Sequence, residues 1–334
     1  MNSNLSSYNK DSYISSKCDF LLPVNGGMLN QSPFVRSVII SIVLVNILAC
    51  PPTVVLNMLV MVAVKVKSRL RTNKSNILIA TLASTDFAVG LFVQPVFIAK
   101  LITTLQEKSF ERVCLLLIVT RVGLSALSTV SVLHLALLSG ERFLALNRPF
   151  AYTNLITTTR LLFASLLTWS MSLILHIPLA FNEAVVIYTS NLVNGIAIIL
   201  IIFCHVAVFC ELRRHKQRIT ALQVTQEERA RFAREKKAFK LTVIIVTVLV
   251  LCFLFFVVAR IVLFQKPRKR SGEIAPIIND LSISITLLNS LLNPIIYSVS
   301  MKQFRISFVE LLFRKVNRQD TRHQARQEPD ERNP

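Results

Sequence analysis

The sequence contains few charged residues, which are frequent in soluble proteins, and few cysteines, which are frequent in disulfide-rich secreted proteins. Charged residues make up only 17% of its 334 residues against 53% hydrophobic ones, and the mean hydropathy is +0.56. Soluble domains are normally more polar than this. Seven glycines and twelve prolines exclude collagen-like and low-complexity chains, and six cysteines are too few for a disulfide-built secreted scaffold. These shortages together predict a polytopic membrane protein.

Long apolar runs fill most of the chain. A helix needs roughly 20 apolar residues to cross the hydrocarbon core of a bilayer. Seven windows reach that length: 34–64, 76–99, 113–139, 161–181, 192–212, 241–264 and 274–298. Pro51 and Pro52 interrupt the first window, and we expect them to kink one helix rather than divide it. The prediction is an all-α integral membrane fold, a seven-transmembrane helix bundle.

The distribution of positive charge predicts how the bundle is oriented. Of the 38 Lys and Arg residues, 26 lie in the connections 65–75, 140–160, 213–240 and 299–334, and 10 in those on the other side. Because excess Lys and Arg marks the cytoplasmic side, we expect an extracellular N-terminus and a cytoplasmic C-terminus. The net charge of +20 is then explained by the orientation in the membrane and by contact with membrane lipids. We therefore expect no nucleic-acid partner.

The first 30 residues are polar and lack a basic start followed by an apolar core. We therefore expect no cleavable signal peptide, with the first span directing insertion. Two sequons, at Asn4 and Asn30, fall on the expected outer side and predict N-glycosylation there.

A carboxylate lies in the second span, where its charge costs about 2.5 kcal/mol or more. This residue, Asp86, is expected to face the bundle, with Ser131, Asn289 and Asn293 as candidate partners. Their oxygen atoms suit a hard cation such as sodium, or a water cluster. A protonated Asp86 that is hydrogen-bonded within a polar seam is an equal alternative.

The seventh span contains the sequence Asn293-Pro294 and then Tyr297. Proline removes a backbone donor and clashes with the preceding turn, so this site can act as a hinge. An ordinary proline kink is the alternative. Tyr297 is expected near the inner end of the span.

Charged residues meet at the inner end of the third span. Arg142 can pair with its neighbour Glu141 or with Glu235, at the foot of the sixth span. A cation that switches between two carboxylates forms a two-state latch. The alternative is an arginine whose charge simply reaches the membrane interface.

Taken together, these motifs resemble the rhodopsin-like (class A) G-protein-coupled receptors, in order across residues 45–313. The resemblance rests on the following residues: Leu56-Asn57, Leu82-Ala83 with Asp86, Glu141-Arg142-Phe143 with Pro149 and Tyr152, Trp169, Pro178, and Asn293 to Tyr297 with Phe304. It implies an extracellular segment 1–33, a receptor domain 34–313 that ends in a short amphipathic eighth helix, and a cytoplasmic tail 314–334.

The resemblance also implies a function. An extracellular ligand would cause the sixth helix to swing outward and open a cavity for a heterotrimeric G protein at the plasma membrane. Arg142 would hold the resting state through Glu141 and Glu235. Asp86, Ser131, Asn289 and Asn293 match the family's allosteric sodium site, and no other cofactor is expected.

Some positions depart from the family pattern. Phe253 stands where the sixth helix usually has tryptophan, and the proline that follows it in the family is also absent, so the activation hinge has a different pivot. The second outer loop has no cysteine. Either Cys18 pairs with Cys114, which we favour, or both thiols stay free.

The ligand is expected to differ from an amine. Leu124 stands where the amine receptors have an acidic residue, whereas the cations Lys100, Arg121 and Arg260 point to the outer third of the bundle. A guanidinium matches carboxylate and phosphate geometry, which predicts an anionic small molecule, lipid or peptide. The alternative is that Arg260 pairs with Asp280 while the other two cations reach interfacial water.

Two other functions compete with a receptor. A membrane-embedded metal hydrolase would use His134, His176 and His205, but these residues lie in three different spans. A membrane transporter would be expected to show inverted repeats, and none is visible. We therefore expect a receptor and no enzyme activity.

Overall fold

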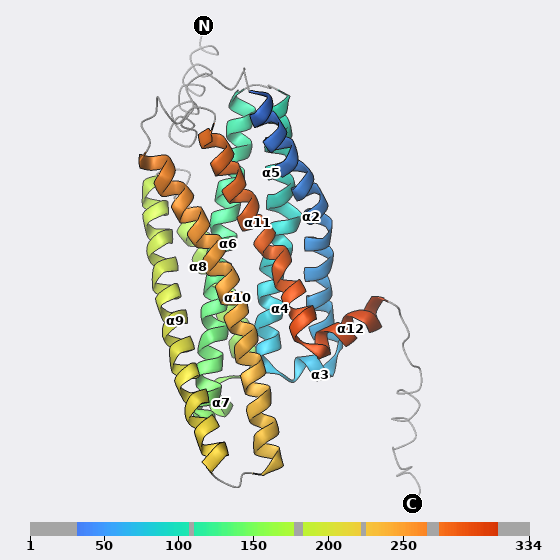
Figure 1. Cartoon of the computed structure of the whole chain (residues 1–334), viewed down its shortest axis with the longest axis vertical. Helices are drawn as coiled ribbons and strands as arrows, with labels where there is room; N and C mark the ends of the chain where they lie inside the picture. The colour runs from blue at the N-terminus through green and yellow to red at the C-terminus, as the bar shows by residue number, and fades with distance from the viewer. Residues whose placement is uncertain (1–31, 107–109, 177–182, 222–224, 266–273, 313–334) are drawn as a thin grey trace, which may run out of the picture.

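The structure is a computed structural model that describes residues 32–106, 110–176, 183–221, 225–265 and 274–312. Its elements in these ranges are helical (Figure 1), and their bounds are as follows: α2 (Pro33–Val66), α3 (Ser68–Arg71), α4 (Lys74–Ala88), the π-helical turn η2 (Val89–Val93), α5 (Gln94–Leu105), α6 (Phe110–Asn147), α7 (Pro149–Leu155), α8 (Thr158–His176), α9 (Glu183–Ala221), α10 (Gln226–Gln265), α11 (Ile274–Ser300) and α12 (Lys302–Leu312).

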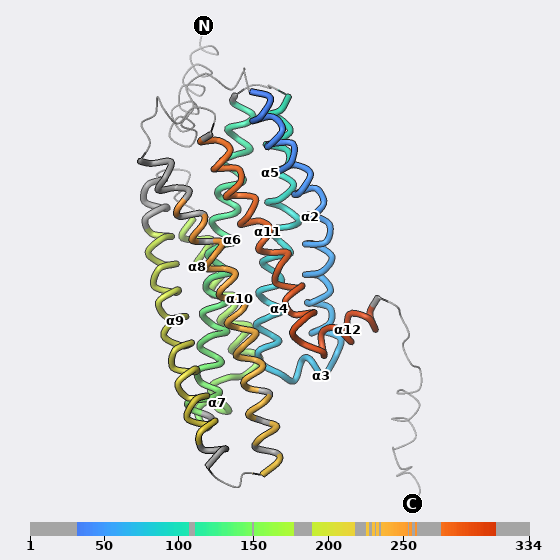
Figure 2. Tube along the Cα trace, viewed as in Figure 1, coloured from blue at the N-terminus to red at the C-terminus, as the bar shows by residue number. Residues whose placement is uncertain are grey.

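Seven long rods lie side by side and form a bundle: α2, the continuous α4–η2–α5, α6, α8, α9, α10 and α11. The chain passes up and down through them in turn (Figure 2). Within the described residues, six rods are long and apolar enough to cross a membrane. The seventh, α10, covers the predicted sixth span. The prediction of a seven-helix bundle is confirmed.

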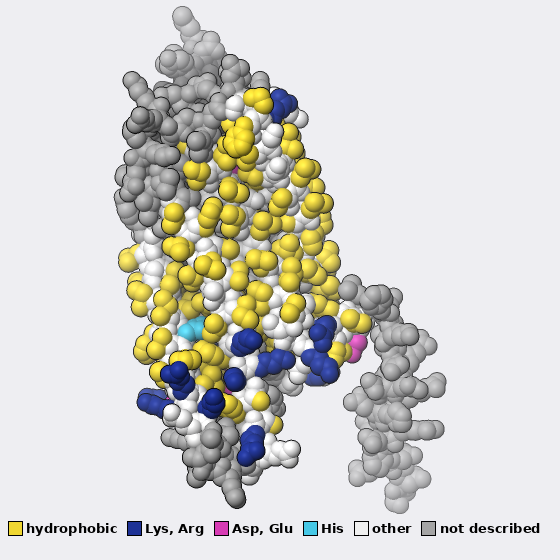
Figure 3. Space-filling view, viewed as in Figure 1, with side chains coloured by type: hydrophobic (Ala, Val, Ile, Leu, Met, Phe, Trp, Pro, Cys, Tyr) yellow, Lys and Arg dark blue, Asp and Glu magenta, His cyan; other side chains and the backbone are white. Residues whose placement is uncertain are grey.

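Apolar side chains cover the outside of the bundle as well as its interior. Leu48, Ile199 and Val299 are among many exposed aliphatic residues, and Figure 3 shows such side chains over the middle of one face. Lys and Arg gather at the end where α12 lies, which we call the α12 end (Figure 3). A helix bundle that is apolar on its outside has lipid as its solvent.

The short helix α12 crosses the base of α11 (Figure 1). Its Phe304 and Phe308 are buried, and the Phe304 ring lies 6.0 Å from that of Tyr297. An ion pair between Lys67 and Glu310 fixes it to the end of α2. The amphipathic eighth helix is thus present where the sequence predicts it.

Pro51 and Pro52 do not divide the first rod, as expected, since α2 runs through both. Beside these prolines the second rod contains η2, where the backbone of Gly90 approaches α2 closely. A Cβ atom on Gly90 would lie 2.9 Å from Thr53 Cγ2. Thr53 is held in place because its hydroxyl donates to Ala49 O at 2.7 Å. Only a glycine fits this contact without displacing the neighbouring helix.

We expect Gly90→Val to lower the free energy of unfolding by about 1–3 kcal/mol, the usual cost of overpacking. Gly195→Val is the matched control, because a Cβ built there meets no atom of a neighbouring helix within 4 Å in the described residues. The midpoint of thermal unfolding of purified protein measures both. Equal midpoints for the two variants would show that α2 and η2 do not pack as described.

Candidate functional site

At the α12 end, a buried carboxylate collects three donors. Glu141 Oε1 accepts a hydrogen bond from the Tyr152 hydroxyl at 2.9 Å, and Oε2 accepts one from the Ser75 hydroxyl at 2.8 Å. Arg142 Nε lies 3.2 Å from the same Oε2. Burial, followed by the charge of Glu141, raises the pKa of Tyr152, so its hydroxyl keeps its proton and stays a donor. Glu141 is therefore firmly held.

Arg142 also faces a second carboxylate, on α10. Its guanidinium NH1 lies 3.6 Å from Glu235 Oε2, an oxygen with no hydrogen-bond partner in the described part of the chain. At that distance the contact is electrostatic rather than a hydrogen bond. The structure thus brings the three predicted latch residues together, with a tight contact within α6 and a loose one to α10.

Sequence reasoning assigned Ser75 no role, and it named Tyr152 only as part of a motif. Neither type of residue signals a partner by itself, because hydroxyls in helices mostly bond to their own backbone. Ser75 is the second residue of α4, after the N-cap Asn73 and Lys74, so its position at the end of a span was the only available clue.

Near the middle of the bundle, Asp86 is almost completely buried. Its Oδ2 accepts a hydrogen bond from Asn293 Nδ2 at 2.7 Å, which joins α4 to α11. Ser290, which the sequence analysis did not single out, also bonds to Asp86. Of the predicted partners, Asn293 is therefore in contact with Asp86, whereas Ser131 is buried and Asn289 partly buried.

Among the residues that the structure describes, several buried oxygen atoms of α2 and α11 have no hydrogen-bond partner, namely Asn57 Oδ1, Asn289 Oδ1 and the Tyr297 hydroxyl. Carbonyl oxygens only accept, so each amide oxygen calls for a bound donor or a cation. Together with the Asp86 carboxylate they fit a hard cation. Asn293 differs from the prediction here, because it presents its N–H group to Asp86 rather than an oxygen.

The hinge region is only partly described. Pro294 lies inside α11, which continues to Ser300. Tyr297 is fully buried at the α12 end of that helix, as expected. The side chain of Phe253, on α10, lies outside the described residues.

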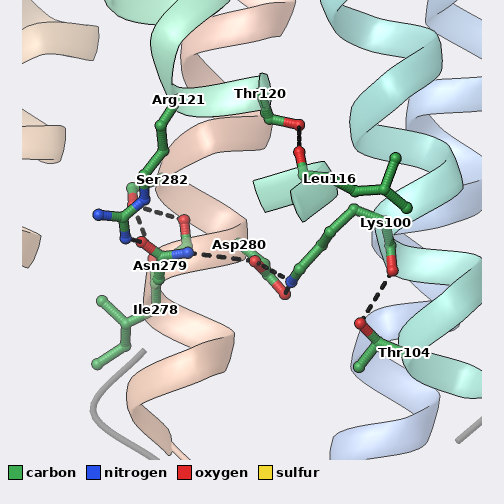
Figure 4. A network of polar contacts seen from close by, with 9 residues as sticks. All are labelled: Lys100, Thr104, Leu116, Thr120, Arg121, Ile278, Asn279, Asp280 and Ser282. Atoms are coloured by element: carbon green, nitrogen blue, oxygen red, sulfur yellow. Dashed lines mark hydrogen bonds and ion pairs between the residues drawn. The ribbon is translucent and has the colours of Figure 1, made fainter. Parts of the chain in front are cut away.

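The opposite end of the bundle contains a buried ion pair between α5 and α11. Lys100 Nζ donates to both carboxylate oxygens of Asp280 at 2.7 Å, and each residue is only 1% exposed (Figure 4). The expected alternative, in which Arg260 pairs with Asp280 and Lys100 reaches water, is wrong for Lys100. A lysine one turn from a helix end can reach water only if its stem points outward, and this one points inward.

Arg121, on α6, joins the same network. Its NH2 group donates to Asn279 Oδ1 at 2.6 Å, and Asn279 Nδ2 donates to Asp280 Oδ1 at 3.3 Å. Figure 4 shows the side chains from three helices converging here. Leu124 is buried in an apolar cluster with Leu117 and Leu287. The side chain of Arg260 lies outside the described residues.

The three histidines of the hydrolase alternative stay apart. His134 bonds to Ser165 at 2.7 Å, whereas His176 bonds to Ser125 at 2.9 Å and to Ser190 at 3.2 Å. His205 bonds to its own helix. Among the described residues, no three His, Cys, Asp or Glu side chains form a metal-binding group.

Cys114 is disulfide-bonded, and the four other cysteines in the described ranges are free thiols. Its expected partner Cys18 lies outside the described residues, as do the glycosylation sequons at Asn4 and Asn30. The pairing and the glycosylation remain predictions.

The chain is similar to known proteins over most of its length. The family model described as "7 transmembrane receptor (rhodopsin family)" matches residues 56–189 and 180–297. The 5-hydroxytryptamine receptor 1D of Rattus norvegicus is 25% identical over 348 residues, covering 83% of this chain and 91% of that protein. The human alpha-1A adrenergic receptor is 27% identical over 235 residues, covering 55% of this chain and 50% of that protein.

These matches agree with the seven-helix bundle. They favour a signalling receptor over the metal hydrolase and the transporter. The chain belongs to the rhodopsin family of seven-transmembrane receptors, the G-protein-coupled receptors.

Proposed function

We propose that this receptor lies in the plasma membrane with its N-terminal segment outside, and passes an extracellular chemical signal to a heterotrimeric G protein. The gathering of Lys and Arg at the α12 end supports this orientation (Figure 3), because positive charge is retained on the cytoplasmic side. The ligand would then bind at the end that contains Lys100, Arg121 and Asp280. The G protein would bind at the end that contains Arg142.

The unequal contacts of Arg142 carry this proposal. Glu141 lies on the same helix as Arg142 and has two further donors, whereas Glu235 lies on α10 at 3.6 Å. When α10 moves outward, the Glu235 contact breaks and Arg142 keeps a partner. The movement therefore leaves Arg142 paired with Glu141. The resting state is held by the Glu235 contact, which is weak enough for a ligand to overcome.

We expect Glu235→Ala to raise ligand-free G-protein activation about two- to fivefold. Partly exposed ion pairs contribute up to about 1 kcal/mol, and that amount shifts a two-state equilibrium by about fivefold. Arg142→Ala should instead reduce coupling. Nucleotide exchange by a panel of purified heterotrimers measures both effects.

Glu211→Ala is the matched control for this experiment, since Glu211 pairs with Arg214 and His215 within α9. Its basal rate should equal that of the unaltered receptor. If neither Glu235→Ala nor Arg142→Ala changes nucleotide exchange, Arg142 is only an interfacial cation.

We propose that a sodium ion binds at Asp86 as an allosteric cofactor. The orphaned oxygens of Asn57 and Asn289 support this assignment, and Ser131 is the remaining predicted ligand. Bound sodium would supply positive charge beside a buried carboxylate. It would thereby favour the conformation that keeps α4 and α11 together through Asp86 and Asn293.

Exchange of NaCl for KCl should lower the thermal-unfolding midpoint of the receptor, and Asp86→Asn should remove this difference because the neutral amide no longer attracts a cation. Thr85→Val serves as a control, because the Thr85 hydroxyl donates to Thr81 O of its own helix. A sodium effect of unchanged size in Asp86→Asn would disprove the site.

We propose that the ligand carries a carboxylate or phosphate that Arg121 recognises. The relatives are named for 5-hydroxytryptamine and as adrenergic receptors, but Leu124 gives this chain no carboxylate at the position where amine receptors have one. Arg121 lies between α6 and α11, and its planar guanidinium fits such anions. Arg260 and the basic connection 265–273 would attract them from outside.

In a screen of anionic lipids, nucleotides and acidic peptides, Arg121→Ala should raise the concentration needed for half-maximal activation at least tenfold, and Arg260→Ala should raise it less. The loss of a charge-assisted hydrogen bond accounts for about 1.5–3 kcal/mol. Arg36→Ala, an exposed cation at the same end, is the control. Responses indifferent to the first two changes would disprove anion recognition.

A further inference from the structure

The buried ion pair of Lys100 and Asp280 is costly for the protein to keep. Both side chains are removed from water, and Phe97 and Leu101 on the same helix as Lys100 are fully buried as well. The attraction within such a pair often does no more than repay the cost of desolvating its two charges. Packing alone would be served as well by apolar residues of similar volume, so the pair calls for another explanation.

The pair limits which ligands can enter this part of the bundle. An anion that takes Lys100 from Asp280 leaves a buried carboxylate without its cation, and an amine that takes Asp280 leaves a buried ammonium without its anion. Each outcome is strongly unfavourable in a low-dielectric interior. A ligand with one positive and one negative group can bind both side chains at once, so each buried charge keeps an opposite charge beside it.

The neighbouring groups favour the same exchange. Asn279 Nδ2 already donates to Asp280 Oδ1 at 3.3 Å, and Arg121 reaches Asn279 Oδ1 at 2.6 Å. A guanidinium therefore lies one amide group away from the ion pair (Figure 4). An incoming carboxylate would meet two cations, from α5 and α6, while an incoming ammonium would meet the carboxylate from α11.

We propose that Lys100, Asp280 and Arg121 form a subsite for a zwitterion, a small amino acid whose ammonium binds Asp280 and whose carboxylate binds Lys100 and Arg121. This inference rests on the proposed function and narrows its anionic ligand to one that also carries an ammonium group. On binding, the direct tie between α5 and α11 is replaced by one that passes through the ligand. The ligand thus acts on α11, which also bonds to Asp86 through Asn293.

The test compares three matched series on the full-length receptor. The first contains glycine, β-alanine, γ-aminobutyrate and 5-aminopentanoate; the second contains the corresponding carboxylates without the amine, and the third the corresponding amines without the acid. G-protein nucleotide exchange reports activation. We expect one amino acid to act at a concentration at least tenfold lower than its matched acid and its matched amine.

A double variant, Lys100→Met with Asp280→Asn, removes both charges and leaves no unpaired charge in the interior. It should keep its thermal-unfolding midpoint and lose at least tenfold in affinity for the active amino acid, measured as the ligand-induced rise of that midpoint. Lys67→Met with Glu310→Gln is the matched control, because it removes the ion pair that joins α2 to α12. Its affinity for the amino acid should be unchanged.

Three results would overturn the zwitterion subsite: an acid or an amine as potent as its amino acid, no response to any compound of the three series, or full affinity in the Lys100→Met, Asp280→Asn variant. Potent acids whose action needs Arg121 would overturn this inference and keep the proposed anionic ligand. Potent amines that are indifferent to Arg121 would overturn both.

Discussion

The constraint that shapes this molecule is the absence of water around its middle. Lipid offers no hydrogen bonds, so every polar group within the spans must find a partner inside the bundle. The outward faces are accordingly apolar, while the interior holds Asp86 with Asn293, Lys100 with Asp280 and Glu141 with its three donors. Each of these contacts joins helices, or holds a charge that joins helices, so the function and the packing depend on the same few side chains.

The three polar groups lie at different depths and differ in how firmly they are held. The Lys100 ion pair is bidentate and buried, whereas Arg142 meets Glu235 at 3.6 Å. Between them in depth lies Asp86, and the amide oxygens of Asn57 and Asn289 have no donor among the described residues. The strongest of these contacts lies where we propose that the ligand binds, and the weakest joins α6 to α10, the helix that we propose moves.

The sequence was sufficient to predict the fold, because membrane spans are set by length and hydropathy, which can be counted directly. It also predicted which carboxylates and amides face the interior, since a charge in lipid has few alternatives. Asp86 with Asn293, and Arg142 with Glu235, were predicted in this way. Depth along a span follows from counting residues, and these pairs share a depth.

Rotation about the helix axis is what the sequence did not provide. Lys100 and Arg260 both lie in the outer third, and only the coordinates show that Lys100, on α5, is the partner of Asp280 on α11. Ser75 and Ser290 were missed because a serine in a membrane helix has a partner in its own backbone and carries no charge that demands another. Hydroxyl contacts therefore need coordinates, whereas buried charges often do not.

The π-helical turn η2 determines the direction in which the side chains of α5 point around the axis of the second rod. It fits one extra residue into a turn, and one residue corresponds to about 100° of rotation in an α-helix. Loss of a single residue from Val89–Val93 would leave the span long enough for the bilayer, yet would rotate α5 and carry the Lys100 ammonium off the α11 face. Deletion of one codon would therefore separate Lys100 from Asp280 at the outer end. Asp86 and the α12 end would keep their positions.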